Sequence, residues 1–343
     1  MSNTTQSSRT TQTEDAYIER AENLLNLFSK ENNKASLSDN DYVELAEWLI
    51  QRKPNISRAT WRYYKSSIIY YLESQIKHSE ASNMLKKAGN EGCKDKDVIP
   101  LAFKQTSARK KKSITEREET MIIDHLKRLG NKSFWALPTL AFFKATILTG
   151  LRPDEWTSVQ YIEDEKHAPE TMKNTLPILK VKNAKSTNGR SHGEYRHLGL
   201  GDLGERELTY IKIQIQYTNI ALNKRWMTPT GQAETFAEYY KSIQSCIYRT
   251  TRTLFPIAKK RPTIYSCRHQ FIADLKHAKY TLEAIAALVG HATDETASEH
   301  YGKRRFGRKR SGLPTPNPEE VLKIKQLYQG RIAHDEQPNL RPE

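Results

Sequence analysis

The stretch 263–301 restricts the fold of this chain more than any other part of the sequence, because it predicts two consecutive short helices with defined ends. In the first helix, apolar residues recur at steps of three and four, which predicts a face packed against a core. Arg268 falls beside that face. A guanidinium next to apolar packing requires an anion, so we expect either a carboxylate partner or a bound phosphate there. The apolar positions are Ile264, Cys267, Phe271, Leu275 and Ala278.

The second helix of this stretch has recognisable signals at both ends. Thr281 is placed to be its N-cap, and Gly290 suits a left-handed C-terminal cap. His291 therefore leaves the helix at a defined point. Tyr301 follows ten residues later and precedes a basic run that contains Lys303, Arg304, Arg305, Arg308, Lys309 and Arg310.

The charge balance indicates a polyanionic partner. The chain of 343 residues has a net charge of +15, and the excess is concentrated in stretches such as 108–112 and 303–310. Such a field steers association with nucleic acid, although solubility alone is the simpler alternative. The length, together with 37% hydrophobic residues, favours two domains with their own cores.

Other classes of function find no support in the sequence. Cys93, Cys246 and Cys267 are odd in number and far apart, so we interpret them as reduced structural thiols and expect neither disulfides nor a metal site. We expect no cofactor. The polar N-terminus has no signal-peptide core and no apolar run approaches a membrane span of roughly 18 residues, which favours a bacterial cytosol or nucleoid.

The N-terminal part predicts a disordered arm at 1–14 and a small helical domain at 15–105. The third of its four predicted helices starts after Ser57 and carries an apolar, aromatic side that we assign to the core. Basic residues lie close to the other side and would suit phosphate contacts with DNA. They are Arg58, Arg62 and Lys65.

A basic linker is predicted at 106–113, where no apolar period is present. Between two basic domains it would contact the DNA backbone, or else serve only as a solvated tether. Its basic residues are Arg109, Lys110, Lys111 and Lys112.

A second domain is predicted at 114–316. Thr115 and Glu118 form a capping signal for its first helix, and Gly150 ends a later, more apolar helix. Arg152 stands on the turn that follows. Glu155 can hold the guanidinium group of Arg152 in place, so that Arg152 can bind an anion. The spacing then predicts strands at 176–182 and 194–200, with a third strand possible, and further helices at 203–224 and 232–254. The predicted fold class is mainly α with a small antiparallel β-sheet.

The loop between the two predicted strands carries Lys185, whose flexible ammonium could reach a neighbouring site. Together with Arg152, Arg268, His291 and Tyr301, it forms a set that suits metal-free phosphoryl transfer. The arginines can bind the non-bridging oxygens, the tyrosine can attack the phosphorus, and the lysine can protonate the leaving oxygen.

These residues occur in segments that resemble, in order, the motifs of the tyrosine recombinases, the phage integrase family. The similarity covers about two thirds of the chain and includes TGLRPDE at 149–155, KST at 185–187, CRHQF at 267–271 and LVGH at 288–291. Tyr301 stands where the family has its nucleophile. The resemblance implies catalytic roles for Arg152, Lys185, Arg268, His291 and Tyr301, with Glu155 as the supporting acid.

The resemblance also implies an architecture and partners. A helical core-binding domain and an α+β catalytic domain would clamp double-stranded DNA with inverted-repeat core sites. Cleavage and rejoining would proceed through a 3′-phosphotyrosyl intermediate and a Holliday junction in a homotetramer, without metal or ATP, with accessory DNA-bending proteins as possible partners. Residues 317–343 would form a C-terminal helix and tail that dock on a neighbouring protomer through Val321, Leu322, Ile324 and Leu327.

One position departs from the family pattern. Three residues before Arg268 the family usually has histidine, whereas this chain has Tyr265, a neutral hydrogen-bond donor that we still count among the catalytic residues. Two alternatives therefore stay open. One is a catalytically weak DNA-binding accessory protein of the same fold, and the other is an enzyme similar to type IB topoisomerases or telomere resolvases.

Overall fold

The computed structural model of the chain describes residues 11–94, 111–130, 132–184, 193–223, 235–291 and 302–335. The chain divides into two compact units, Met1–Gln105 and Thr106–Glu343. The fold is mainly helical with one small antiparallel sheet, so the predicted fold class is confirmed. All three cysteines are free, as predicted.

The first unit is a helical bundle around its own apolar core. Ser57 caps α3 by accepting a hydrogen bond from the Thr60 amide, and Trp61 and Ile68 of α3 are fully buried. Helix α1 begins at Thr11, so the last four residues of the segment predicted as a disordered arm are helical. Glu14 in the first turn favours this start through the helix dipole. The helices are α1 (Thr11–Glu31), α2 (Asp39–Gln51), α3 (Arg58–Tyr71) and α4 (Ser79–Lys87), with short helical turns η1 (Lys53–Asn55) and η2 (Leu72–Ile76).

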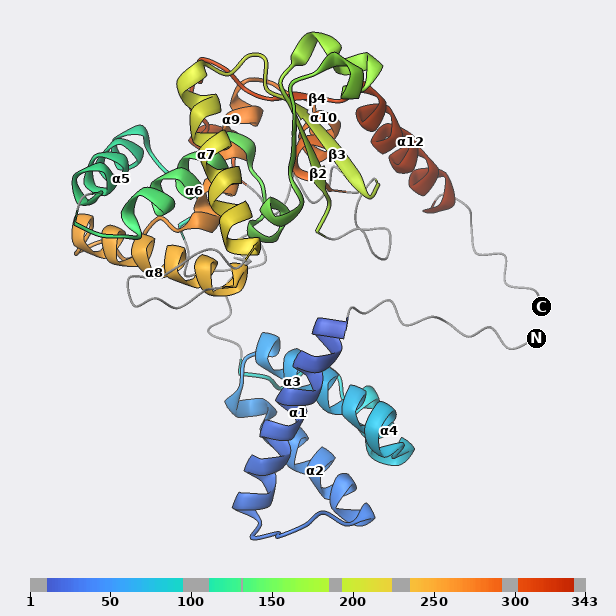
Figure 1. The fold of residues 1–343 in the computed structure, drawn as a ribbon. Coiled ribbons are helices and arrows are strands. Elements are labelled where there is room, and N and C mark those ends of the chain that lie inside the picture. Colours follow the sequence, from blue (N-terminus) through green and yellow to red (C-terminus); the bar gives the residue numbers. More distant parts are fainter. Residues whose placement is uncertain are drawn as a thin grey trace. The chain divides into compact units, whose positions relative to one another are not determined.

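The second unit consists of seven longer helices in its described part and a four-stranded sheet (Figure 1). The helices are α5 (Glu116–Leu129), α6 (Ala136–Thr149), α7 (Glu205–Leu222), α8 (Phe236–Leu254), α9 (Ile264–His277), α10 (Leu282–Val289) and α12 (Pro318–Asp335). The short turns are η4 (Pro153–Ser158), η5 (Glu165–His167), η6 (Glu170–Thr175) and η7 (Arg304–Phe306). The strands are β1 (Gln160–Ile162), β2 (Ile178–Lys182), β3 (Tyr195–Gly199) and β4 (Thr315–Pro316).

The sheet has the order β1-β2-β3-β4, and all its neighbours are antiparallel. The predicted hairpin is present as β2 and β3, in the register Val181↔Arg196 and Leu179↔Leu198. The two edge strands have three and two residues, which is too short for a period of two to be recognised in a sequence. The sequence suggested a sheet of up to three strands, whereas the sheet has four.

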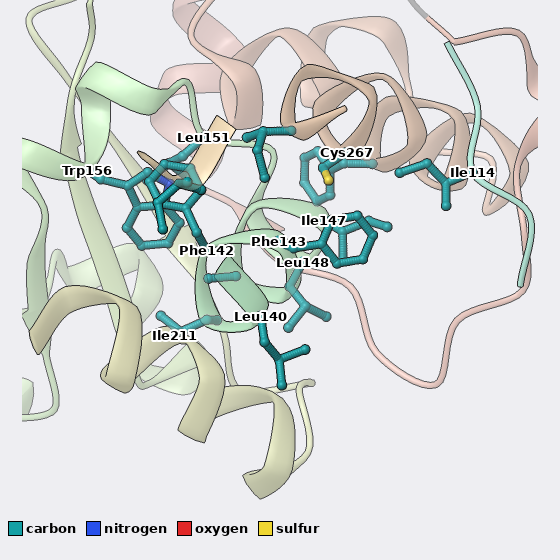
Figure 2. Close-up of a cluster of buried hydrophobic side chains, with 14 of the residues drawn as sticks. Ile114, Leu140, Phe142, Phe143, Ile147, Leu148, Leu151, Trp156, Ile211 and Cys267 are labelled. Atoms are coloured by element: carbon teal, nitrogen blue, oxygen red, sulfur yellow. The ribbon is translucent and has the colours of Figure 1, made fainter. Parts of the chain in front are cut away.

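Helix α6 lies at the centre of the second unit's core. It is apolar on all sides, and twelve of its residues are buried, as is typical of a helix surrounded by others. Figure 2 shows Phe142, Phe143 and Leu148 of this helix among side chains from several other segments, including Trp156 and Cys267. The apolar face predicted for 264–278 is thus part of this core. Because this face is packed, the orientation of α9 and of the polar side chains that it carries is fixed.

Helix α12 packs on α10 of the same chain (Figure 1). Ile324 is fully buried against Ala286 and Ala287, with Val321 partly buried beside it. Strand β4 and a hydrogen bond of 2.8 Å between His197 and Glu320 direct α12 to this position. Half of the surface predicted to dock on another protomer is therefore used within the chain, while Leu322 and Leu327 stay exposed.

No helix in the described part of the chain has the length and apolar character needed to cross a membrane.

Replacement of Gly150 by alanine is expected to lower the free energy of unfolding by about 3 kcal/mol, because two penalties add. Gly150 has φ +67°, and a Cβ there would lie 2.2 Å from Cδ1 of Phe271. Gly204→Ala is the matched control, since Gly204 has φ −71° and a Cβ there would meet only Glu207 Oε2, at 4.0 Å. Urea unfolding measures both variants, and equal losses would contradict the packing argument.

Candidate active site

The site is organised around the carboxylate of Glu155, which is buried at the turn η4. Pro153 occupies the first position of this turn, and the carboxylate accepts a hydrogen bond of 2.7 Å from the backbone amide of Arg152. Oε1 also accepts one of 2.8 Å from Nη1 of the same arginine. The predicted pair of Arg152 and Glu155 is therefore present, although the carboxylate has further partners.

Arg196 on β3 is the strongest of these partners, and the sequence analysis did not identify it. Its Nη2 and Nη1 donate to the two oxygens of Glu155 at 2.7 and 3.2 Å, and the side chain is fully buried. The signal was available in the sequence, because Arg196 is in phase with the buried Leu198 and Leu200 of the strand. An arginine on the inward face of a strand requires a buried carboxylate.

Arg196 also connects two other segments to the site. Its Nε donates to the carbonyl of Leu288 at 2.9 Å, and Nη1 donates to Oδ1 of Asn183 at 2.6 Å. Asn183 in turn donates to the carbonyl of Gly193, so it bridges the two ends of the loop that carries Lys185. Gly290 leaves room for this arrangement, since a Cβ there would lie 2.3 Å from Asn183 Oδ1.

Arg268 reaches the same site from α9, with 1% of its surface exposed. Its Nη1 donates to the carbonyl of Gly150 at 2.6 Å and lies 3.9 Å from Glu155 Oε2. Its Nη2 donates to the carbonyl of Val289 at 2.6 Å. The carboxylate partner expected for Arg268 is present, and backbone carbonyls at the ends of α6 and α10 orient the guanidinium.

His291 is placed directly after the left-handed cap at Gly290, as the sequence predicted. Its Nε2 lies 3.2 Å from Nη2 of Arg268. A guanidinium only donates, so Nε2 accepts and the ring proton sits on Nδ1. Burial and the charge of Arg268 lower the pKa of His291 to about 2, which makes the imidazole neutral near pH 7.

The electrostatic balance of this centre favours an anion. Burial alone would raise the pKa of Glu155, but Arg196, Arg268 and Arg152 together hold it well below the usual range. Three guanidinium groups therefore face one carboxylate, which leaves a net charge of two positive units while His291 is neutral. Arg152 retains 14% side-chain exposure and is the arginine of the three that solvent reaches.

Tyr265 stands at the first turn of α9 and is 38% exposed. Its ring packs edge-on against the imidazole of His269, with 5.0 Å between ring centroids. Burial lowers the pKa of His269 to about 4, so this neighbour is neutral as well. Tyr265 also lines a cavity of about 230 Å³, together with Tyr240, Tyr248 and Arg261.

The remaining predicted site residues are not brought together by the described structure. Lys185, Tyr301, Arg109 and Lys110 lie outside the described residues, so their roles stay predictions. Lys111 forms an ion pair with Glu118. Lys112 lies near the start of the second unit, and its charge contributes to the lowered pKa of His269.

The basic residues predicted on α3 differ in their surroundings. Arg58 and Arg62 are exposed one turn apart. Lys65 donates to the carbonyl of Ala88 at 2.7 Å, and burial lowers its pKa. Its ammonium is thus engaged within the first unit, which makes it a weaker candidate for a phosphate contact.

A basic surface adjoins Tyr265. Residues 239–273 contain seven lysines and arginines and no aspartate or glutamate. Tyr248 on this surface is 56% exposed. The exposed cations are Lys241, Arg249 and Arg252 on α8 and Lys259 and Lys260 on the following turn. Among the described residues, no group of three or more His, Cys, Asp or Glu is arranged to hold a metal ion.

Comparison with known proteins gives similarity in fold. No protein-family model and no curated protein matches the chain. The Tn1549 transposon integrase in complex with circular intermediate DNA shares 15% identity over 82% of this chain and 87% of that chain, with a TM-score of 0.47. XerA recombinase shares 12% identity over 92% of each chain, with a TM-score of 0.34.

A protelomerase covalently complexed with substrate DNA shares 12% identity over 95% of this chain and 98% of that chain, with a TM-score of 0.45. The sequence motifs predicted the fold of a tyrosine recombinase, and an enzyme similar to telomere resolvases was an alternative that they left open.

Replacement of Arg196 by methionine is expected to lower the free energy of unfolding by about 3 kcal/mol or more, because it removes the main partner of a buried carboxylate. Arg249→Met on the exposed side of α8 is the matched control and should change stability by less than about 0.5 kcal/mol. Chemical unfolding measures both. Similar stabilities for the two variants would show that Arg152 and Arg268 suffice to hold Glu155.

His291 is expected to make stability depend on pH below its ordinary pKa of 6.5 and down to its folded pKa of about 2. The unfolded imidazole takes up a proton below its ordinary pKa of 6.5, whereas the folded one stays neutral until about pH 2. The unfolded state then binds more protons, so the free energy of unfolding falls as the pH is lowered, by at most about 1.4 kcal/mol per pH unit.

Urea unfolding at several pH values measures this slope, and His291→Gln should reduce it. The lowered pKa of His269 contributes equally to both proteins and cancels in the difference. An unchanged slope in the variant would mean that His291 is protonated in the folded chain.

Proposed function

We propose that this chain is a site-specific DNA recombinase that cleaves and rejoins strands through a 3′-phosphotyrosyl intermediate. The observation that carries the proposal is the arginine centre around Glu155, where three guanidinium groups face one carboxylate and leave two positive charges uncompensated. A phosphodiester supplies the anion that this centre lacks. The order of the sequence motifs supports the same reaction.

Arg152 and Arg268 would bind the two non-bridging oxygens of the scissile phosphate. Preorganised donors of this kind stabilise charge that develops in the transition state, and loss of one costs about 3–4 kcal/mol in comparable sites. The contacts of Arg268 to Gly150 and Val289 hold its guanidinium in place before DNA binds. Glu155 and Arg196 act through these arginines and are positioning residues.

Tyr301 would be the nucleophile. Its phenol loses its proton to solvent as the oxygen attacks the phosphorus, a tyrosyl ester forms at the 3′ phosphate, and the bond to the 5′ oxygen breaks. Lys185 would give its proton to that leaving oxygen. The 5′ hydroxyl of a partner strand then attacks the ester and releases Tyr301, so the number of phosphodiester bonds is conserved and no ATP is consumed.

Tyr265 and His291 would complete the contacts to the phosphate. Tyr265 can donate one hydrogen bond from its partly exposed phenol, where a histidine would add charge. His291, neutral and bonded to Arg268 through Nε2, keeps the proton on Nδ1 as a donor. Both groups are neutral, so the positive charge in this site belongs to the arginines and Lys185.

The DNA would be held by basic groups from both units. Arg58 and Arg62 of the first unit, the linker cations and the surface of α8 would contact phosphates, with affinity that falls as salt rises. Recombination further implies a homotetramer on paired inverted-repeat sites and a Holliday junction as an intermediate. The protein would act in a bacterial cytosol or nucleoid. The exposed Leu322 and Leu327 of α12 remain available for contacts between subunits.

The proposal predicts that Tyr301→Phe binds DNA normally and forms no covalent adduct with a nicked suicide duplex, because the phenyl ring lacks the attacking oxygen. Denaturing gels detect the adduct, and gel shifts measure binding. Tyr280→Phe is the control, since this half-buried tyrosine precedes the motif of His291 and should form the adduct at the wild-type rate. An adduct with Tyr301→Phe would exclude Tyr301 as the nucleophile.

A further inference from the structure

A cavity of about 230 Å³ lies between α8 and the first turn of α9. Its inner lining is apolar, because Ile247 and Ile264 belong to the buried core of the second unit. Tyr240 completes this part of the lining, and its ring packs on Phe142 of α6 with 5.4 Å between ring centroids. The core thus holds these three side chains in place, and the shape of the cavity with them.

Polar groups complete the lining. Tyr240 and Gln244 share a side-chain hydrogen bond, and burial raises the pKa of Tyr240 to about 12, so this phenol keeps its proton near pH 7. Arg261 donates from Nε to the carbonyl of Phe255 at 2.8 Å and from Nη2 to that of Pro256 at 2.5 Å. These two bonds hold its guanidinium plane in one orientation. An amide, a phenol and a planar cation can therefore meet the polar edge of a ligand.

Two further tyrosines line the cavity and are accessible from solvent. More than half of Tyr248 is exposed, and more than a third of Tyr265. Tyrosine rings stack on nucleobases with little dependence on the base, because every base has a flat π-face. A ligand that enters from solvent would therefore meet aromatic rings before it reaches the apolar lining.

The size of the cavity favours a small, flat ligand. Pockets for drug-sized ligands have about 300–1,000 Å³, and this cavity has about 230 Å³. It therefore suits one ring system better than a whole nucleotide. A nucleobase matches the lining as well, since its faces are apolar and its edge carries hydrogen-bond donors and acceptors.

The surroundings of the cavity indicate that the base belongs to DNA. Tyr248 and Gln244 also border an open depression on α8, next to the cavity. Residues 239–273 contain no aspartate or glutamate, so backbone phosphates can approach this region without repulsion from carboxylates. A base could enter the cavity while its strand follows the depression. The other residues that line the depression are Lys241, Ser245 and Arg249.

Tyr265 places the cavity next to the proposed phosphate site. It lies one helical turn before Arg268, and side chains at this spacing have Cβ atoms about 5–6 Å apart. Arg268 is proposed to bind the scissile phosphate. The base that reaches the cavity would therefore belong to a nucleotide beside that phosphate.

We propose that the cavity lined by Tyr240, Tyr248 and Tyr265 binds one unstacked base of the cut strand, next to the phosphate that is cleaved. The proposal rests on the proposed function, because rejoining to a partner strand requires the bases beside the break to leave their original pairs. Unstacking and unpairing a base costs free energy, and stacking in the cavity offsets part of this cost. The cavity would hold the base after one pair opens and before the next pair forms.

A mismatch scan tests this binding site. A single mismatch is moved one base pair at a time through the intact form of the duplex used for the adduct assay, and fluorescence anisotropy measures each Kd. A mismatch lowers the cost of unpairing, so wild-type protein should bind about fivefold or more tightly when the mismatch lies beside the cleaved phosphate.

An abasic nucleotide in the cut strand is the control for flexibility of the DNA. It weakens the duplex at the same position but leaves no base to fill the cavity, so the gain in affinity should disappear. Equal Kd values for all duplexes, or equal gains from the mismatch and the abasic nucleotide, would overturn the inference.

Variants of Tyr248 test the contribution of stacking. Tyr248→Ala should reduce the gain from the mismatch to less than about twofold, whereas Tyr248→Phe keeps the ring and should retain the gain. Phe134→Ala is the matched control, since Phe134 is an exposed aromatic residue of the same unit outside the cavity lining. A full gain in Tyr248→Ala would overturn the inference.

The adduct assay distinguishes failure of this inference from failure of the proposed function. Wild-type adduct without any preference for a mismatch would overturn the inference and leave the proposed function standing. A preference that depends on Tyr248, without wild-type adduct, would support base binding and contradict the proposed cleavage. Binding of deoxyadenosine monophosphate that depends on Tyr248, together with equal Kd values for all duplexes, would indicate a site for free nucleotides and overturn the inference.

Discussion

The ion cluster at Glu155 is the interaction on which the rest of the second unit depends. One buried carboxylate meets guanidinium groups from η4, β3 and α9, and these arginines in turn bind carbonyls at the ends of α6 and α10. Each charge would be costly to bury alone, so the five segments are stable only when they meet. Three guanidinium groups against one carboxylate leave the cluster with more positive than negative charge.

Helix α9 shows how one element can serve several parts of a site. Its apolar face enters the core around α6, and Arg268 points to the carboxylate. Gln270 and Asp274 accept hydrogen bonds from the backbone amides of Ile114 and Arg308. These faces cannot move independently, because a helix is a rigid body held by its backbone hydrogen bonds. A shift that reached Gln270 or Asp274 would therefore also reach Arg268.

The sequence predicted much of the local structure, since the signals are short-range. Thr115 and Thr281 cap their helices, and Gly150 and Gly290 end theirs with positive φ, as their neighbours in the chain predicted. Arg196 was missed because one arginine in a short strand resembles a solvent-facing residue until its phase with Leu198 and Leu200 is considered. The edge strands β1 and β4 were missed because two or three residues are too few to show the alternation of apolar and polar side chains that marks a strand.

The sequence by itself determined which residue types are present, the periodic faces of the helices and their caps, because these depend on spacing along the chain. The tertiary structure decided that Glu155 serves three arginines, that Ile324 packs on α10, and that Gln270 bridges the linker end and Phe306. These pairings join residues up to 156 positions apart. Long-range partners are selected by burial and charge compensation in three dimensions, which a local pattern does not contain.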